Sequence, residues 1–301
     1  MNQQQIEAIV EAVLKELGRG ASPRGSALAE AAPAPGRAII IDLPDLTTAE
    51  MRQRTWLEKP ANPDVLRALK ATTPARIGVG RAGPRYRNQP LFLFLADHAM
   101  TQDALFREIA QAFLERFNLF QVQTRVQDRQ EYLLRPDLGR VLSDEARRTL
   151  AERCVKHPDV QVYLADGLSV AAIEANLADI LPVLQQGFAQ AKLTMGTPFY
   201  VKYGRVGLMN DVNKIVDAQV VISLIGERPG LGRAESMSAY MGYRPKPDST
   251  DADRDVVCNI YAGGTNPVEA GAYVVELATK MIRHQASGVR LKLTLAEEST
   301  R

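Results

Sequence analysis

The chain has 301 residues and an almost balanced charge, with 37 Lys and Arg against 35 Asp and Glu. That balance argues against a protein that binds nucleic acid through bulk positive charge. The longest apolar run, 91–96, is far too short to cross a membrane, and the first residues lack the features of a secretory signal. Two cysteines cannot form a disulfide framework, and three widely spaced histidines argue against a zinc or iron site. We therefore expect a cytoplasmic protein that binds neither nucleic acid nor membrane.

The first part of the chain predicts a helix on a tether. Aliphatic residues in 1–18 recur at the spacing of one helical face, and mostly acidic residues take the other face. Residues 19–36 are rich in Ala, Gly, Pro and Ser, which predicts a flexible linker. Two interpretations stay open. The helix docks on its own domain or frays in solution, or it is a docking peptide for another protein. A membrane-surface helix is disfavoured because the polar face is acidic.

Residues 37–150 predict a mixed, α-rich region. Asn, Pro and Asp at the start of 62–70 are typical of a helix N-terminus. Helical spacing recurs over 101–117, and alternation over 120–126 predicts a half-buried strand. A further helix, capped by the serine before it, is expected over 144–154.

Residues 151–290 predict an α/β domain with a mostly parallel, Rossmann-like sheet flanked by helices. Strands are expected at 160–164, 199–202, 220–225 and 256–261. Ser169 is expected to cap a helix that runs to about residue 192, with Pro182 as a kink, and Pro267 opens the last helix. Residues 291–301 are expected to form a tail.

Each expected strand is followed by a loop that contains glycine. These loops are 166–169, 203–206, 226–232 and 262–266. Ligands of open α/β sheets bind outside the carboxyl ends of the strands, so the loops could together form one ligand-binding crevice. The alternative is that the glycines are simply turn residues.

No motif in the chain indicates a nucleotide or a hydrolase site. Residues 78–83 match G-x-G-x-x-G, but Pro84 and Pro90 follow so closely that we expect no helix to begin there and meet a pyrophosphate. The chain has neither a P-loop nor a G-x-S-x-G elbow, and we identify no set of catalytic residues.

Three charged features remain as candidates. Glu227 follows the most apolar strand and could accept hydrogen bonds from a ligand, although a pair with Arg228 or Arg233 or a loop-capping role would also explain it. Four arginines in 76–87 could bind a phosphate or an anionic partner, or form a solvated loop. His98 is expected to be a structural histidine with its hydrogen bonds satisfied.

Short motifs spread over the chain resemble one known family. They are GRAGPR at 80–85, LFLFLADHA at 91–99, LLRPDLGR at 133–140, ADGLS at 165–169, GTPFYVKYGRV at 196–206, GERPGLGRAESMSAY at 226–240, ADR at 252–254 and GGTNPVEA at 263–270. Together and in this order, over about residues 60–287, they resemble the small (light) subunit of ethanolamine ammonia-lyase.

The resemblance implies a function beyond what the residues alone indicate. The family enzyme uses adenosylcobalamin to convert ethanolamine into acetaldehyde and ammonia. Its TIM-barrel large subunit holds the substrate and the catalytic residues, the small subunit closes over the cobalamin, and the assembly is understood as six large with six small subunits. The family's cobalamin contacts fall here on Val206, Glu227 and the stretch Val256–Cys258. Relatives often carry Cys where this chain has Val256, so a backbone contact is implied there rather than a sulfur contact.

Two further expectations concern the cofactor and the tethered helix. The chain lacks D-x-H-x-x-G, the signature that offers a histidine to cobalt, which favours base-on cobalamin. Ethanolamine pathways of this family are commonly enclosed in bacterial microcompartments, and residues 1–18 resemble their encapsulation peptides. Shell proteins are therefore possible partners. A free-standing nucleotide-dependent α/β enzyme and a scaffold protein are the rival classes.

Overall fold

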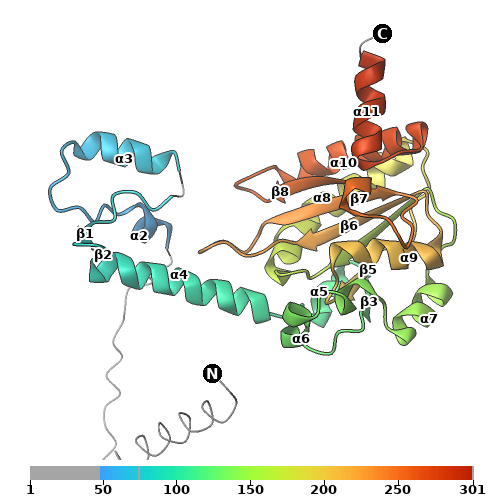
Figure 1. Ribbon diagram of the computed structural model, residues 1–301, viewed down its shortest axis with the longest axis horizontal. Coiled ribbons are helices and arrows are strands. Elements are labelled where there is room, and N and C mark those ends of the chain that lie inside the picture. The colour runs from blue at the N-terminus through green and yellow to red at the C-terminus, as the bar shows by residue number, and fades with distance from the viewer. Residues whose placement is uncertain (1–47, 74, 300–301) are drawn as a thin grey trace, which may run out of the picture. The chain divides into compact units, whose positions relative to one another are not determined.

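The computed structural model describes residues 48–73 and 75–299 (Figure 1). The predicted helix at 1–18 and the linker at 19–36 lie outside the described residues. No helix within the described ranges is both long enough and apolar enough to span a membrane.

The first described segment is α-helical with one small hairpin. Its elements are α2 (Ala49–Gln53), α3 (Pro63–Ala71), the paired strands β1 (Arg81–Ala82) and β2 (Arg85–Tyr86), and α4 (Asn88–Phe106). The predicted start of α3 is confirmed, since Asn62 Oδ1 accepts a hydrogen bond of 3.0 Å from the Val65 amide. Our expectation that no helix begins after the glycine-rich motif is wrong. Pro90 lies in the first turn of α4, where the missing N–H has no helical partner to lose.

The next segment leads into the sheet. It contains α5 (Gln111–Arg116), β3 (Phe120–Gln123), α6 (Arg129–Leu134), a 3-10 turn (Leu138–Arg140) and α7 (Asp144–Arg153). The helical spacing over 101–117 belongs to two helices, because the backbone is extended at Arg107 and Ala110. Ser143 caps α7 as predicted, accepting a hydrogen bond of 3.1 Å from the Ala146 amide.

The central sheet has six strands in the order β3-β5-β4-β6-β7-β8. The strands after β3 are β4 (Val160–Ala165), β5 (Phe199–Lys202), β6 (Val220–Gly226), β7 (Met237–Tyr243) and β8 (Arg254–Ile260). The first four in spatial order are parallel, and β7 is antiparallel to both of its neighbours. The predicted α/β class with a mostly parallel sheet is confirmed. The strand β7 was not predicted.

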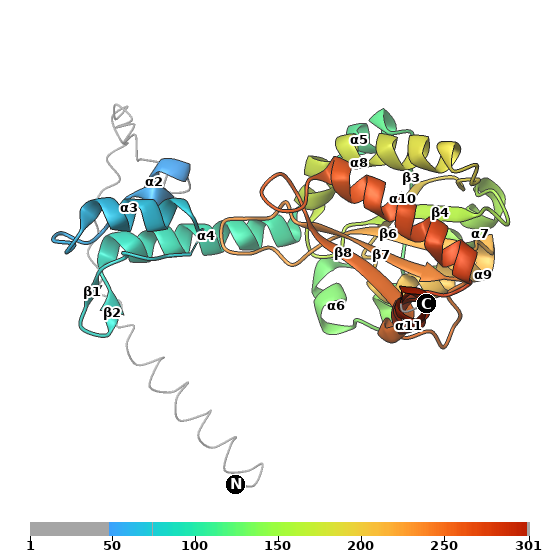
Figure 2. The same cartoon turned by 90° about the horizontal axis from the view of Figure 1, so that it is seen from above.

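Helices cover both faces of the parallel part of the sheet (Figures 1 and 2). On one face lie α8 (Val170–Gln190) and α10 (Pro267–His284), with Leu291 of α11 (Gly288–Ser299) at the edge of the same core. On the other face lie α7 and α9 (Met209–Val216). In β4, Val162 and Leu164 face α8 while Tyr163 and Ala165 face the opposite core, so the whole strand is buried. Most of the segment expected to be a tail lies in α11.

The antiparallel part of the sheet leaves an open patch on the α9 side. Tyr240 of β7 is only half-buried at the margin of that core, and Val256 of β8 pairs with it and is 48% exposed. Because opposite residues in a ladder share a face, the two side chains lie next to each other. The candidate site is built around this patch.

Candidate functional site

Three of the predicted glycine-bearing loops meet at the carboxyl ends of β4, β5 and β6. The Leu168 amide donates a hydrogen bond of 3.0 Å to the Gly226 carbonyl oxygen. The Gly204 amide donates one of 3.2 Å to Asp166 Oδ1. These bonds join loops that are far apart in sequence into one surface. The fourth loop lies farther along the same edge, where the Arg233 guanidinium donates to the Tyr261 hydroxyl over 2.9 Å.

Gly226 is required for the close approach of these loops. A β-carbon at this position would lie 2.0 Å from the Ser169 carbonyl oxygen and 2.6 Å from that of Asp166. Ser169 occupies the N-cap position of α8 as predicted, but its side chain forms no capping hydrogen bond. Its hydroxyl instead donates to the Ala234 carbonyl oxygen, which links the loop after β4 to the strand connection beyond Gly226.

A buried ion pair supports the loops from beneath. Arg129 Nη2 lies 2.9 Å from Asp166 Oδ2, and its Nη1 donates to the Gly167 carbonyl oxygen over 2.8 Å. Burial raises the pKa of Asp166 to about 6, although the Arg129 charge acts in the opposite direction. The Arg129 guanidinium also lies 5.0 Å from the Tyr132 ring and 5.1 Å from the Tyr203 ring. At neutral pH the pair is charged and fixes the positions of two loops.

Two adjoining pockets open on this surface. Arg205, Val206 and Tyr240 line both of them. The smaller pocket, of about 160 Å³, is bounded by Glu227 and the loop after β4. The larger, of about 950 Å³, lies between the Val206 turn, α9 and Val256. The fold therefore brings Val206, Glu227 and Val256 to one continuous surface.

Glu227 offers a carboxylate to this surface. The side chain is half-buried, and the structure gives it no hydrogen bond or ion pair with any described residue. The sequence allowed an ion pair between Glu227 and Arg228 or Arg233, but neither pair forms. The Arg233 guanidinium instead donates a hydrogen bond to the Tyr261 hydroxyl. The Glu227 backbone is fixed, because its amide donates to the Ser236 carbonyl oxygen over 3.0 Å. A fixed backbone with a free carboxylate is suited to accepting hydrogen bonds from a ligand.

Sequence reasoning missed Tyr240, which lies at the centre of the patch. Burial raises the pKa of its phenol, and the nearby Glu227, Asp251 and Cys258 raise it further. Cys258 is exposed but lines neither pocket. The available sequence signal was an aromatic residue at the end of the GERPGLGRAESMSAY motif. The strand that carries Tyr240 was not predicted, so this signal did not place the residue at the site.

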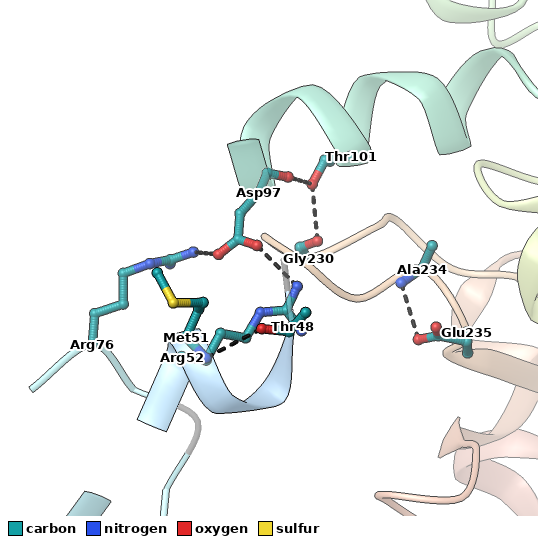
Figure 3. A network of polar contacts seen from close by, with 9 residues as sticks. All are labelled: Thr48, Met51, Arg52, Arg76, Asp97, Thr101, Gly230, Ala234 and Glu235. Atoms are coloured by element: carbon teal, nitrogen blue, oxygen red, sulfur yellow. Dashed lines mark hydrogen bonds and ion pairs between the residues drawn. The ribbon is translucent and has the colours of Figure 1, made fainter. Parts of the chain in front are cut away.

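The connection between β6 and β7 is also held in its middle, by α4 (Figure 3). Thr101 Oγ1 donates a hydrogen bond of 3.0 Å to the Gly230 carbonyl oxygen. One turn earlier on α4, the buried Asp97 carboxylate forms ion pairs with Arg52, at 2.9 Å, and with Arg76. The loop that begins with Glu227 is therefore anchored twice: the Glu227 amide joins its two ends, and Thr101 holds its middle.

The arginine-rich segment 76–87 is not one free cationic cluster. Arg76 pairs with Asp97 and Arg87 pairs with Glu58, while the Arg81 guanidinium lies 4.9 Å from the Tyr86 ring. His98 is exposed, and no hydrogen bond to a described residue satisfies it, so the expected structural role is wrong.

The chemistry of the patch is that of hydrogen bonding over a large area. It offers backbone groups of three loops, a carboxylate, a phenol and guanidinium groups. Among the described residues, no group of three or more His, Cys, Asp and Glu is arranged to hold a metal ion. Such a surface is suited to binding a large polar ligand.

Comparison with protein families places the chain in a known family. A family model described as ethanolamine ammonia-lyase light chain (EutC) matches residues 63–292. The match includes every residue that lines the two pockets.

Proposed function

The chain belongs to the ethanolamine ammonia-lyase light-chain family, and we propose that it binds adenosylcobalamin together with a large subunit. The complex would convert ethanolamine into acetaldehyde and ammonia. The observation that carries the proposal is the meeting of Val206, Glu227 and Val256 around Tyr240, in two adjoining pockets.

The donors and acceptors on this surface fit a corrinoid. The edge of a corrin ring carries amide groups, which need carbonyl oxygens, N–H groups and carboxylates as partners. Glu227 offers a carboxylate with no other partner among the described residues, and the Val206 turn offers backbone groups. Arg205 Nε and Arg254 Nε are buried and have no hydrogen-bond partner in the described part of the chain. Both arginines line the larger pocket.

The cofactor would supply the cobalt–carbon bond and its radical chemistry. This chain would position the corrin ring and exclude water from one side of it. We assign no catalytic residue to the chain, in keeping with a substrate held by the large subunit. The absence of a D-x-H-x-x-G motif supports binding of the cofactor in its base-on form.

Exposed apolar side chains on the first described segment support an interface with the large subunit. Phe92 and Leu95 of α4 are 55% and 50% exposed, and Val65 and Leu69 of α3 are 53% and 52% exposed. Each helix thus carries two exposed apolar side chains about one turn apart, and exposed apolar surface of this kind commonly marks a protein contact. We assign this surface to the large subunit, in an assembly of six large with six small subunits.

Residues 1–18 supply a further proposal, which rests on sequence alone. The helical apolar face and the linker support a docking peptide for the shell proteins of a bacterial microcompartment. The enzyme would then work inside the compartment, where acetaldehyde is retained.

Co-purification tests the proposed function. The tagged chain should be co-expressed with the large subunit in cells supplied with cobalamin, and the purified complex examined for bound corrinoid. We expect both the large subunit and a corrinoid to co-purify. A chain that purifies without the large subunit, or a complex that carries no corrinoid, would contradict the proposal.

A further inference from the structure

We propose that Arg140 and Arg205 form a subsite for the phosphodiester in the nucleotide loop of cobalamin. The inference rests on the proposed function, and it assigns a role to two residues outside the predicted contacts. Both arginines line the larger pocket, beside Val206.

The charges around the larger pocket leave these two arginines without a carboxylate partner. Its acidic residues are each paired with a cation: Asp137 with Arg135, Asp211 with Arg147 and Lys214, and Asp251 with Arg254. These pairs also account for the other two cations of the lining, Lys214 and Arg254. Arg140 and Arg205 form no ion pair with a described residue. The pocket therefore has positive charge to offer an anion.

Gly139 and Gly207 leave room for the two arginine side chains. Arg205 packs against Gly139, which precedes Arg140, and Arg140 packs against Gly207, which follows Val206. A β-carbon on Gly139 would lie 2.7 Å from Arg205 Cγ, and one on Gly207 would lie 3.3 Å from Arg140 Cδ. The Arg205 amide donates a hydrogen bond of 2.9 Å to the Gly139 carbonyl oxygen. The turn Leu138–Arg140 and the turn Val206–Leu208, which follows Arg205, are thus joined, and each brings one arginine to the same pocket.

Arg205 is held in place, whereas Arg140 is free to meet a ligand. The Arg205 guanidinium lies 3.9 Å from the centre of the Tyr132 ring, and its Nη2 donates to the Tyr132 carbonyl oxygen over 2.6 Å. Its Nε is buried without a partner among the described residues. Arg140 is exposed, and no hydrogen bond from its side chain to a described residue is formed. A guanidinium held in place and an exposed one without a protein partner can together accommodate the two free oxygens of a phosphodiester.

The proposed division of work between the subunits orients the nucleotide loop toward this chain. If the large subunit holds the substrate, the reactive side of the bound cofactor would face that subunit. The nucleotide loop would then face this chain, where Val206 and the two arginines would be placed to hold its phosphodiester.

A comparison of two corrinoids tests the subsite. Cobinamide lacks the nucleotide loop and its phosphate, whereas cyanocobalamin has both. Their affinities for the complex with the large subunit can be measured by equilibrium dialysis. We expect Arg140→Gln to weaken cyanocobalamin binding by about tenfold or more and to leave cobinamide binding unchanged. Arg140→Lys should restore part of the loss. Arg148→Gln, on the exposed side of α7, is the matched control and should change neither affinity.

The outcomes separate this inference from the proposed function. Equal weakening of both corrinoids, or no change in either, would overturn the subsite. Arg140→Gln could instead weaken the association of the two subunits and leave the ratio of the cyanocobalamin and cobinamide affinities unchanged. The arginines would then contact the large subunit, and the proposed subsite would also be overturned. If the wild-type complex binds neither corrinoid, the proposed function itself fails and the subsite with it. If Glu227→Ala weakens both corrinoids while Arg140→Gln affects neither, only the subsite fails.

Discussion

Arg129 and Asp166 form a buried ion pair, with 2.9 Å between Nη2 and Oδ2, directly beneath the loops that follow β4 and β5. Asp166 also accepts a hydrogen bond from the Gly204 amide, two residues before Val206. The pair thus connects the core of the sheet to the proposed corrinoid surface. Its charge state should influence both the stability of the fold and the position of the Val206 turn.

The raised pKa of Asp166 gives a dependence of stability on pH with a defined sign. Burial raises this pKa to about 6, above the value of roughly 3.9 in an unfolded chain. The folded protein therefore binds the proton more tightly, and the stabilisation is complete below about pH 4 and lost as the pH rises through about 6. Urea unfolding at several pH values should show this decline in the wild type. The free energy of unfolding of the wild type, compared with that of Asp166→Asn at the same pH, should fall by about 1–3 kcal/mol between about pH 4 and about pH 7. If the difference in the free energy of unfolding between the two proteins did not change with pH, the raised pKa of Asp166 would be contradicted.

The close approach at Gly226 predicts a steric cost. Gly226→Ala should lower the free energy of unfolding by about 1–3 kcal/mol, because the new methyl group meets two carbonyl oxygens. Gly230→Ala, four residues later, is the matched control, since a β-carbon there meets only the Arg233 carbonyl oxygen, at 3.9 Å. Urea denaturation of both variants measures the difference. Equal stabilities would mean that the loops do not pack as closely as described.

Glu227 should contribute to corrinoid binding and little to folding. Glu227→Ala should weaken binding of adenosylcobalamin to the assembled complex by about 1–3 kcal/mol, the cost of losing a charged hydrogen-bond partner. The melting temperature of the chain should hardly change, because the carboxylate has no partner among the described residues. Glu235→Ala, in the same connection but outside both pockets, is the control. An unchanged affinity in Glu227→Ala would refute the assignment.

The parallel strands and the edge strand β8 could be predicted from sequence, whereas the antiparallel strand β7 could not. The strands β4 and β6 are buried on both faces, and each is apolar except for one polar residue, Gln161 in β4 and Ser223 in β6. The strand β7 contains Ser238 and Gly242, and its burial depends on pairing with β6 on one side and β8 on the other. Local sequence carries no signal of that pairing.

The site was predictable in part for a related reason. Val206 and Glu227 follow strands that could be recognised, and the family motifs include them. Tyr240 lies on the strand that was missed. The ion pair between Arg76 and Asp97 joins residues that only the packing of α4 brings together, so the basic segment appeared unpaired in sequence. Contacts of this kind depend on tertiary structure and leave no local pattern.

Removal of residues 1–18 should separate targeting from assembly. The truncated chain should bind the large subunit and support full activity, because the deleted segment precedes both the matched family region and the proposed site. A fluorescent fusion of the truncated chain should no longer enter microcompartments, whereas a fusion of the full chain should. A truncated chain that still enters them by itself, or a loss of cofactor-dependent activity on truncation, would exclude a targeting role.

Reconstitution of activity tests the central claim most directly. The purified chain, a purified ethanolamine ammonia-lyase large subunit, adenosylcobalamin and ethanolamine should be combined, and each component omitted in turn, while acetaldehyde is measured. We predict acetaldehyde only when all four are present, because this chain contributes cofactor binding and the large subunit contributes the catalytic residues. Acetaldehyde production by the chain without the large subunit would contradict the account, and so would full activity of the large subunit without the chain.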